Sequence, residues 1–353
     1  MPQIELLHLA SLGDSGWERC YALHCRAHAE QGTRARSLQA YRVMQLAAAS
    51  GVASHARSWI AREGPEVVGK LDLSGNAAVP DQAVLNVYVA PEVRRVGIAR
   101  ALVAVALCEA ERTGVQWIET STAQPESWHL CERCGGQRTR GGTLLTLRLA
   151  DTNWSLVDAW CADGPKRSAD ARLQEFEQLP RDLADSFIAL HNRAWSDQPH
   201  AMHAGEPLTL AHRREQERSY QRLGWRWITL VARESHAVLV GLTDVLYDPT
   251  QPELVRQNFT GVLPSHRGRG LAKWLKASML HLVHHRFPSA LQLTTSNSNA
   301  NGPMLAINRG LGFGSPIEHR TYRFELAQLR TAINRGAERD ESASTRAALD
   351  RAK

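Results

Sequence analysis

Two short segments rich in arginine and glycine are the parts of this sequence best suited to bind an anion. They are Arg94–Ala99 and Arg267–Ala272, and both have the form Arg-x-x-Gly-x-Ala. Each follows an apolar stretch that ends at a proline, Pro91 or Pro264, and precedes apolar residues at helical spacing. A helix N-terminus has unpaired backbone N–H groups and partial positive charge, glycine permits close approach, and arginine adds donors. The pattern predicts a phosphate-binding loop in each half.

The two loops belong to a longer internal repeat. Val89–Ala99 aligns without gaps on Val262–Ala272 at a constant offset of 173 residues. A period of this length indicates a duplicated domain and not a solenoid. The polar, Gly- and Pro-containing stretch between the repeats is typical of a linker. We therefore predict an N-terminal domain at 1–150, a linker at 151–170, a C-terminal domain at 171–326 and a charged tail at 327–353.

The elements around each loop follow one plan. The expected strand before the loop covers residues 83–89 and 255–263, and the expected helix after it covers 97–112 and 270–285. In both halves an N-terminal strand, helices and a hairpin precede this unit, and a strand, a short helix and a last strand follow it. This order predicts a mixed α/β (α+β) fold.

Composition limits the function further. The chain has 353 residues, of which 43% are hydrophobic and 22% charged, which excludes disordered, collagen-like and coiled-coil classes. Its apolar runs are too short to span a membrane, and its first residues do not form a secretory signal. We expect a cytoplasmic protein with reduced cysteines. The net charge of +6 favours a polyanionic partner, either a phosphate-rich cofactor or a nucleic acid, but the sequence lacks a recognisable nucleic-acid-binding motif.

At the repeated loop the sequence resembles the GNAT superfamily of acyl-CoA-dependent N-acyltransferases, whose signature is Gln/Arg-x-x-Gly-x-Gly/Ala. Both halves resemble GNAT domains, so the resemblance covers residues 1 to about 326 and implies a tandem protein. It implies in each half a mixed sheet, flanked by helices and splayed between its fourth and fifth strands, with the pantetheine arm of acetyl-CoA in the split. The residues that it assigns to acetyl-CoA are Val87, Tyr88, Val89, Thr260, Gly261 and Val262 on the strands, and Arg94, Arg95, Val96, Gly97, Ile98, Ala99, Arg267, Gly268, Arg269, Gly270, Leu271 and Ala272 in the loops.

The two halves differ after the loop. The second half has Asn301 and Asn308 in the last helix and then Leu311-Gly312-Phe313, which is similar to a recurrent GNAT ending, and we count both asparagines among the cofactor-binding residues. The first half has Gly135-Gly136 in place of this closure. We therefore expect the C-terminal domain to be catalytic and the N-terminal domain to be degenerate.

Acyl transfer to an amine requires a base and a stabilised oxyanion. Asp244 and Glu206 are the candidate bases, with His266 beside the second loop. Asn308 and Cys131 stand where many GNAT enzymes have a tyrosine acid, so the sequence does not identify a general acid. The pair Cys131 and Cys134 lacks a second cysteine pair at zinc spacing, so we predict no metal site.

These observations favour an acetyl-CoA-dependent N-acetyltransferase that transfers the acyl group directly to a small-molecule amine in a ternary complex. The alternative is a CoA-binding sensor or structural protein without catalysis. We expect no nucleic-acid or membrane partner, and a monomer or a homodimer.

Overall fold

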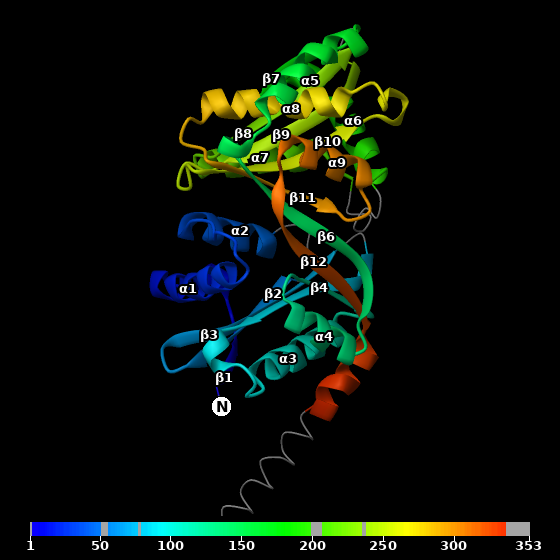
Figure 1. Ribbon diagram of the computed structural model, residues 1–353. Helices are drawn as coiled ribbons and strands as arrows, with labels where there is room; N and C mark the ends of the chain where they lie inside the picture. Colours follow the sequence, from blue (N-terminus) through cyan, green and yellow to red (C-terminus); the bar gives the residue numbers. More distant parts are fainter. Residues whose placement is uncertain (1, 51–55, 77–78, 199–206, 235–237, 337–353) are drawn as a thin grey trace, which may run out of the picture. The chain divides into compact units, whose positions relative to one another are not determined.

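The computed structural model describes residues 2–50, 56–76, 79–198, 207–234 and 238–336 (Figure 1). The chain divides into two units. Unit 1 contains Met1–Arg140 and His319–Lys353, and unit 2 contains Gly141–Glu318. Each unit has a mixed sheet with helices packed on it, as the sequence and the family resemblance predict.

The strands of unit 1 follow one another in the order β1-β2-β3-β4-β5-β12. All neighbouring strands are antiparallel except β4 and β5. Residues 326–336 form a helix directly after the last strand. The elements are β1 (Gln3–Leu6), α1 (Asp14–Glu30), α2 (Leu38–Ser50), β2 (Ala56–Glu63), β3 (Glu66–Asn76), β4 (Val79–Val89), α3 (Ile98–Arg112), β5 (Trp117–Thr122), α4 (Pro125–Arg133) and β12 (Gly314–Glu325).

Unit 2 repeats this arrangement in the order β7-β8-β9-β10-β11-β6, and its parallel pair is β10 and β11. The elements are β6 (Gln137–Arg148), α5 (Trp154–Arg167), β7 (Arg172–Phe176), α6 (Ala184–Ser196), α7 (Leu210–Arg222), β8 (Arg226–Glu234), β9 (Val238–Tyr247), β10 (Leu254–Val262), α8 (Leu271–Arg286), β11 (Gln292–Ser298) and α9 (Gly302–Leu311).

The last strand of each repeat belongs to the unit built by the other repeat. Residues Arg320–Glu325 of β12 pair with β5 in unit 1, and residues 142–148 of β6 pair with β11 in unit 2. The compact units therefore differ from the contiguous domains 1–150 and 171–326 expected from the repeat. Linear sequence does not reveal this exchange, because β6 and β12 occupy the same place in their repeats.

The expected linker at 151–170 contains helix α5. Asn153 caps the helix by accepting a hydrogen bond from the Leu156 N–H, and Val157 is buried in the core of unit 2. Gly164 lies against the Trp274 ring, where an added Cβ would come within 2.2 Å of the indole. The Gly-Pro pair that favours a linker in the sequence therefore lies in the last turn of a helix packed closely on α8.

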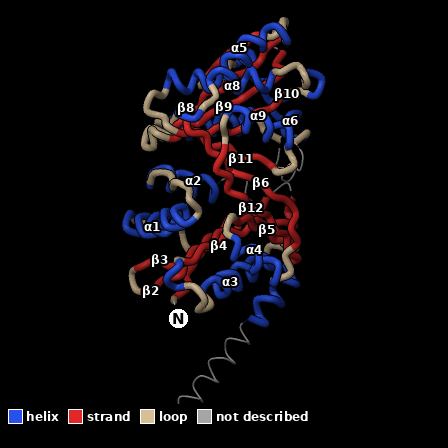
Figure 2. Tube along the Cα trace, in the orientation of Figure 1, coloured by secondary structure: helices blue, strands red, loops and turns tan. Residues whose placement is uncertain are grey.

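Two layers of helices cover the sheet of unit 1 (Figure 2). Helices α1 and α2 pack on one face through Trp17, Cys20 and Tyr41, and α3 packs on the other through a row that includes Leu102. Neighbouring strand residues such as Trp59 and Ile60 point to opposite cores, as the two-residue period of a strand requires. None of the helices in the described ranges has the length and apolar character that a membrane crossing needs.

Candidate functional site

Each glycine loop has the backbone geometry of an anion site. Gly97 and Gly270 adopt left-handed conformations with φ of 89° and 83°, and they cap α3 and α8. Arg95 and Gly268, two residues earlier, also have positive φ, of 70° and 77°. The carbonyl of each glycine accepts the first backbone hydrogen bond of the helix that follows. The donor is the Ala101 N–H in unit 1 and the Trp274 N–H in unit 2. The preceding N–H groups point out of the helix start, where a phosphate would meet them.

The first arginine of each loop donates hydrogen bonds to the preceding strand and to a carboxylate. Arg94 donates from Nε to the Val89 carbonyl at 2.9 Å, and its two terminal nitrogens donate to both oxygens of Glu30 at 2.6 Å. Arg267 repeats this arrangement with the Val262 carbonyl at 3.2 Å and an Asp197 oxygen at 3.3 Å. These carboxylates hold side chains that the resemblance assigns to pyrophosphate. The second arginines, Arg95 and Arg269, are exposed, as are Val96 and Gly268.

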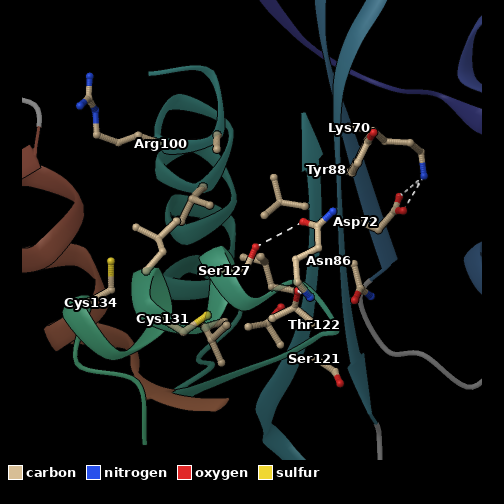
Figure 3. A pocket seen from close by; sticks show the side chains of 18 of the residues that line it. Lys70, Asp72, Asn86, Tyr88, Arg100, Ser121, Thr122, Ser127, Cys131 and Cys134 are labelled. Atoms are coloured by element: carbon tan, nitrogen blue, oxygen red, sulfur yellow. Dashed lines mark hydrogen bonds and ion pairs between the residues drawn. The ribbon is translucent and has the colours of Figure 1, made fainter. Parts of the chain in front are cut away.

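The sheet of unit 1 splits beside its loop, as the resemblance implies. Strands β4 and β5 pair only at Gln82–Val84 with Trp117–Glu119, although both strands continue. A cavity of about 680 Å³ opens beyond this pairing (Figure 3). Its walls come from the strands and from α1, α2, α3, α4 and residues 326–336. They include Val87, Tyr88 and Ala99 from the predicted cofactor set, and Val103, Ser121, Thr122 and Cys131.

The corresponding split in unit 2 is nearly filled. Strands β10 and β11 also pair over three residues and then separate, but the cavity beyond them is only about 50 Å³. Lys276, which stands 173 residues after Val103, has 1% of its surface exposed and donates to Gln257 Oε1 at 2.6 Å. Burial lowers the pKa of Lys276 to about 7. This side chain and the polar groups around it occupy the place that is open in unit 1.

The two predicted asparagines lie in this filled region of unit 2. Asn301 caps α9 by accepting from the Met304 N–H at 3.3 Å, and it lines the small cavity with Thr260. Asn308 is fully buried and donates to Asn297 Oδ1 at 2.6 Å. The residue in unit 1 that takes the place of Asn308 is Cys131, and burial raises the pKa of its thiol to about 12. In the described ranges no group of three or more His, Cys, Asp or Glu side chains is arranged to hold a metal.

The two candidate bases in the described part of the chain, Asp244 and His266, have different surroundings. Asp244 is 5% exposed and accepts hydrogen bonds from Trp227 Nε1 and the Phe259 N–H, both at 2.8 Å. It therefore fixes a bulge in β10, and burial raises its pKa. Glu206 lies outside the described residues. His266 Nε2 lies 3.2 Å from Glu234 Oε2, so this ring contacts a surface carboxylate beside the loop.

The strand position of Asp244 has an open counterpart in unit 1 that no motif of the sequence indicates. Gly69 and Gly241 occupy the same register in β3 and β9, opposite Val89 and Val262, so Asp72 takes the place of Asp244. Asp72 lines the large cavity together with Lys70 (Figure 3). Its side chain is 33% exposed. Extending the internal repeat upstream from the loop points to this carboxylate only when one residue is skipped, because the bulge in β10 changes the offset from 173 to 172.

Comparison with known proteins agrees with this geometry. Residues 17–136 match the family model described as acetyltransferase (GNAT) family. Among solved structures, a tandem GNAT protein from the clavulanic acid biosynthesis pathway, without AcCoA, is 24% identical with a TM-score of 0.74 and covers 92% of this chain and 99% of that chain. A GCN5-related N-acetyltransferase from Sphaerobacter thermophilus is 15% identical with a TM-score of 0.63, covering 92% and 95%. No curated protein matches the sequence.

Proposed function

We propose that unit 1 transfers an acyl group from acyl-CoA to a small-molecule amine, because residues 17–136 match the acetyltransferase (GNAT) family model and the fold is similar to that of a tandem GNAT protein. The observation that carries the proposal is the cavity of about 680 Å³ at the split between β4 and β5. Cavities of this size are typical of small-molecule sites. The family match lies on the same part of the chain.

The residues of unit 1 fit acyl-CoA. The N–H groups at the start of α3 would receive its phosphates, because Gly97 leaves the backbone open there. The pantetheine arm would follow β4 past Val87 and Tyr88, where the strand no longer pairs with β5. Unpaired N–H groups on this stretch are the natural donors to a carbonyl oxygen that gains negative charge. Apolar side chains such as Val103 would cover the arm.

The reaction balances without another reagent. Bound acyl-CoA supplies a thioester. The neutral amine nitrogen forms the new C–N bond as the C–S bond breaks, and the proton that the nitrogen loses protonates the departing CoA thiolate. One cavity that holds both substrates together meets the requirement for direct transfer in a ternary complex. Cys131 stays protonated because burial raises its thiol pKa, so we assign it no nucleophilic role.

We propose that unit 2 acts without acyl-CoA of its own. Its cavity of about 50 Å³ is too small for a pantetheine arm, and Lys276 lies where Val103 opens the cavity in unit 1. This proposal makes the N-terminal unit the catalytic one, whereas the Leu311-Gly312-Phe313 ending in the sequence favours the C-terminal domain.

Matched glycine variants test the assignment. Gly97→Ala and Gly270→Ala place a Cβ at equivalent positions with nearly equal φ, so both carry the same backbone strain, about 1–2 kcal/mol. In calorimetry we expect Gly97→Ala to weaken acetyl-CoA binding about tenfold or more, and Gly270→Ala to leave it within about twofold. We expect one acetyl-CoA per chain. Loss of binding in Gly270→Ala alone would place the site in unit 2 instead.

A further inference from the structure

We propose that the small cavity at the split of unit 2 binds a small carboxylate, of about the size of acetate, beside Lys276. This cavity lies beyond the pairing of β10 with β11, and it shares no lining residue with the large cavity of unit 1. The proposal gives unit 2 a ligand of its own, and it does not depend on acyl transfer in unit 1.

Lys276 lines this cavity with a charge that has no counter-ion. Its side chain is 1% exposed, and Nζ donates to the neutral Gln257 side chain at 2.6 Å. Among the described residues no carboxylate forms an ion pair with it, and the Phe313 ring, 5.4 Å away, adds only weak attraction. An ammonium has three protons, so two remain for a ligand. A buried charge needs a partner of opposite sign.

The other charged groups around the cavity do not supply that partner. Burial lowers the pKa of Lys276 to about 7 without a contribution from any charged group in the described part of the chain. Outside Lys276, the charged side chains of α8, and those of α5 and α9, are exposed. Those on the adjoining strands and beside the cavity contact other residues: Asp197, Arg226, Arg233, Glu234, Asp244 and Arg256.

The polar side chains that line this cavity keep donors for a ligand. Asn301 Oδ1 accepts from the Met304 N–H at 3.3 Å, and Asn297 Oδ1 accepts from Asn308 Nδ2 at 2.6 Å. Because both amide oxygens are used, the N–H groups of Asn301 and Asn297 remain to donate. The Ser298 hydroxyl accepts from a backbone N–H and keeps its own proton in the same way. Several donors around one positive charge favour an anion.

A chain of hydrogen bonds connects Lys276 with another wall of the cavity. Gln257 accepts from Lys276 and donates from Nε2 to Thr243 Oγ1 at 3.1 Å, and the hydroxyls of Thr243 and Thr260 lie 2.8 Å apart. Because Thr243 accepts from Gln257, its own proton is available to Thr260. The Thr260 proton is then left for a ligand in the cavity that this residue lines. An anion would therefore meet donors at both ends of the chain.

The volume of the cavity limits the class of ligand. The cavity measures about 50 Å³, and a site for one water molecule needs about 10–15 Å³, so the space suits about four non-hydrogen atoms. One ammonium matches one negative charge. Phe259 and Met304 add apolar surface to the polar walls. A carboxylate with two acceptor oxygens and a methyl group has this size, charge and polarity.

Acetate titrations with the full-length protein test the site. Urea unfolding at 25 °C is followed at constant ionic strength, which is kept with gluconate because this anion is too large for the cavity. At pH 6 we expect acetate to raise the urea midpoint until it saturates, and acetamide, which has the same shape without the charge, to leave it unchanged. At pH 8 the half-saturating acetate concentration should be about tenfold higher, because the carboxylate binds the ammonium form and most of Lys276 is neutral there.

Matched methionine variants locate the effect. Lys276→Met removes the buried charge, and Lys273→Met removes an exposed charge from the same helix. Acetate should raise the midpoint of Lys273→Met as in the wild type and should not change that of Lys276→Met. An equal rise in folded Lys276→Met overturns the proposal, as does a wild type that does not respond to acetate or responds equally at pH 6 and pH 8.

The wild-type comparisons need no variant, so they remain decisive if Lys276→Met does not fold. Acetyl-CoA binding to the same wild-type samples is measured separately by calorimetry. A protein that binds acetyl-CoA and does not respond to acetate loses only the carboxylate site. A protein that responds to acetate and does not bind acetyl-CoA loses only the function proposed for unit 1.

Discussion

Equivalent residues in the two units lie in different surroundings. Asp72 and Asp244 occupy equivalent strand positions. Asp72 lines a cavity, whereas Asp244 is buried and accepts hydrogen bonds from Trp227 and from the backbone of β10. Val103 and Lys276 share a helix position, and the longer polar side chain is the one that fills its split. A few substitutions on one scaffold therefore separate an open unit from a closed one.

The buried lysine of unit 2 predicts a pH dependence of stability. Burial lowers the pKa of Lys276 to about 7 in the folded state, while the unfolded chain keeps its proton to about pH 10. Between these values the unfolded state binds more protons, so raising the pH stabilises the folded state. We expect the free energy of unfolding of the wild type, relative to Lys276→Met, to rise between pH 7 and 9 by at most about 1.4 kcal/mol per pH unit.

Urea unfolding across this pH range measures the difference. Lys273→Met is the control, since Lys273 is exposed on the same helix, and its difference from the wild type should stay flat. Parallel curves for the wild type and Lys276→Met would contradict the prediction and would mean that the lysine is charged in the folded state across this range.

At the scale of elements, the sequence predicts what local patterns determine. The strand, glycine loop and helix at Val89–Arg112 and Val262–Arg286 agree with prediction, because apolar spacing and a left-handed glycine are local signals. The sequence does not predict helix α5, because Gly164 and Pro165 are typical of a linker. In the structure Gly164 lets the helix pack closely against Trp274. The cavity depends on side-chain volumes from elements far apart in the chain, which no motif contains.

Residues 326–336 show that a charged, alanine-rich sequence can contain a helix of the core. Leu329 is 6% exposed in the core of unit 1, and it also lines the large cavity. We expect Leu329→Ala to lower the free energy of unfolding by about 2–4 kcal/mol and to weaken acetyl-CoA binding. Thr331→Ala, at an exposed site of the same helix, should cost less than about 0.5 kcal/mol. Thermal unfolding and calorimetry on both variants measure this, and equal effects would show that the helix does not contribute to the core.

At the scale of the whole molecule, the exchanged strands make the two repeats interdependent. Unit 1 takes Tyr322 and Phe324 from β12 into its core, where they are 0% and 4% exposed. The Tyr322 hydroxyl donates to Glu132 at 2.9 Å. The corresponding residues of β6, Leu145 and Leu147, are buried in the core of unit 2. Each unit therefore needs a strand encoded in the other half of the sequence, and gene duplication alone does not yield two independent domains.

This exchange predicts that the halves do not fold separately. A fragment of residues 1–152 lacks β12, so β5 keeps an open edge and the core of unit 1 loses two aromatic side chains. Its own β6 supplies only leucines at those positions. We expect fragments 1–152 and 153–353 to aggregate or remain partly unfolded when expressed alone, and to form a soluble 1:1 complex that binds acetyl-CoA when co-expressed. Circular dichroism, size-exclusion chromatography and calorimetry distinguish the cases. If fragment 1–152 is a monomer that unfolds cooperatively and binds acetyl-CoA, the prediction is wrong. Strand β6 would then be able to replace β12 beside β5, and the two pairings would have nearly equal free energies.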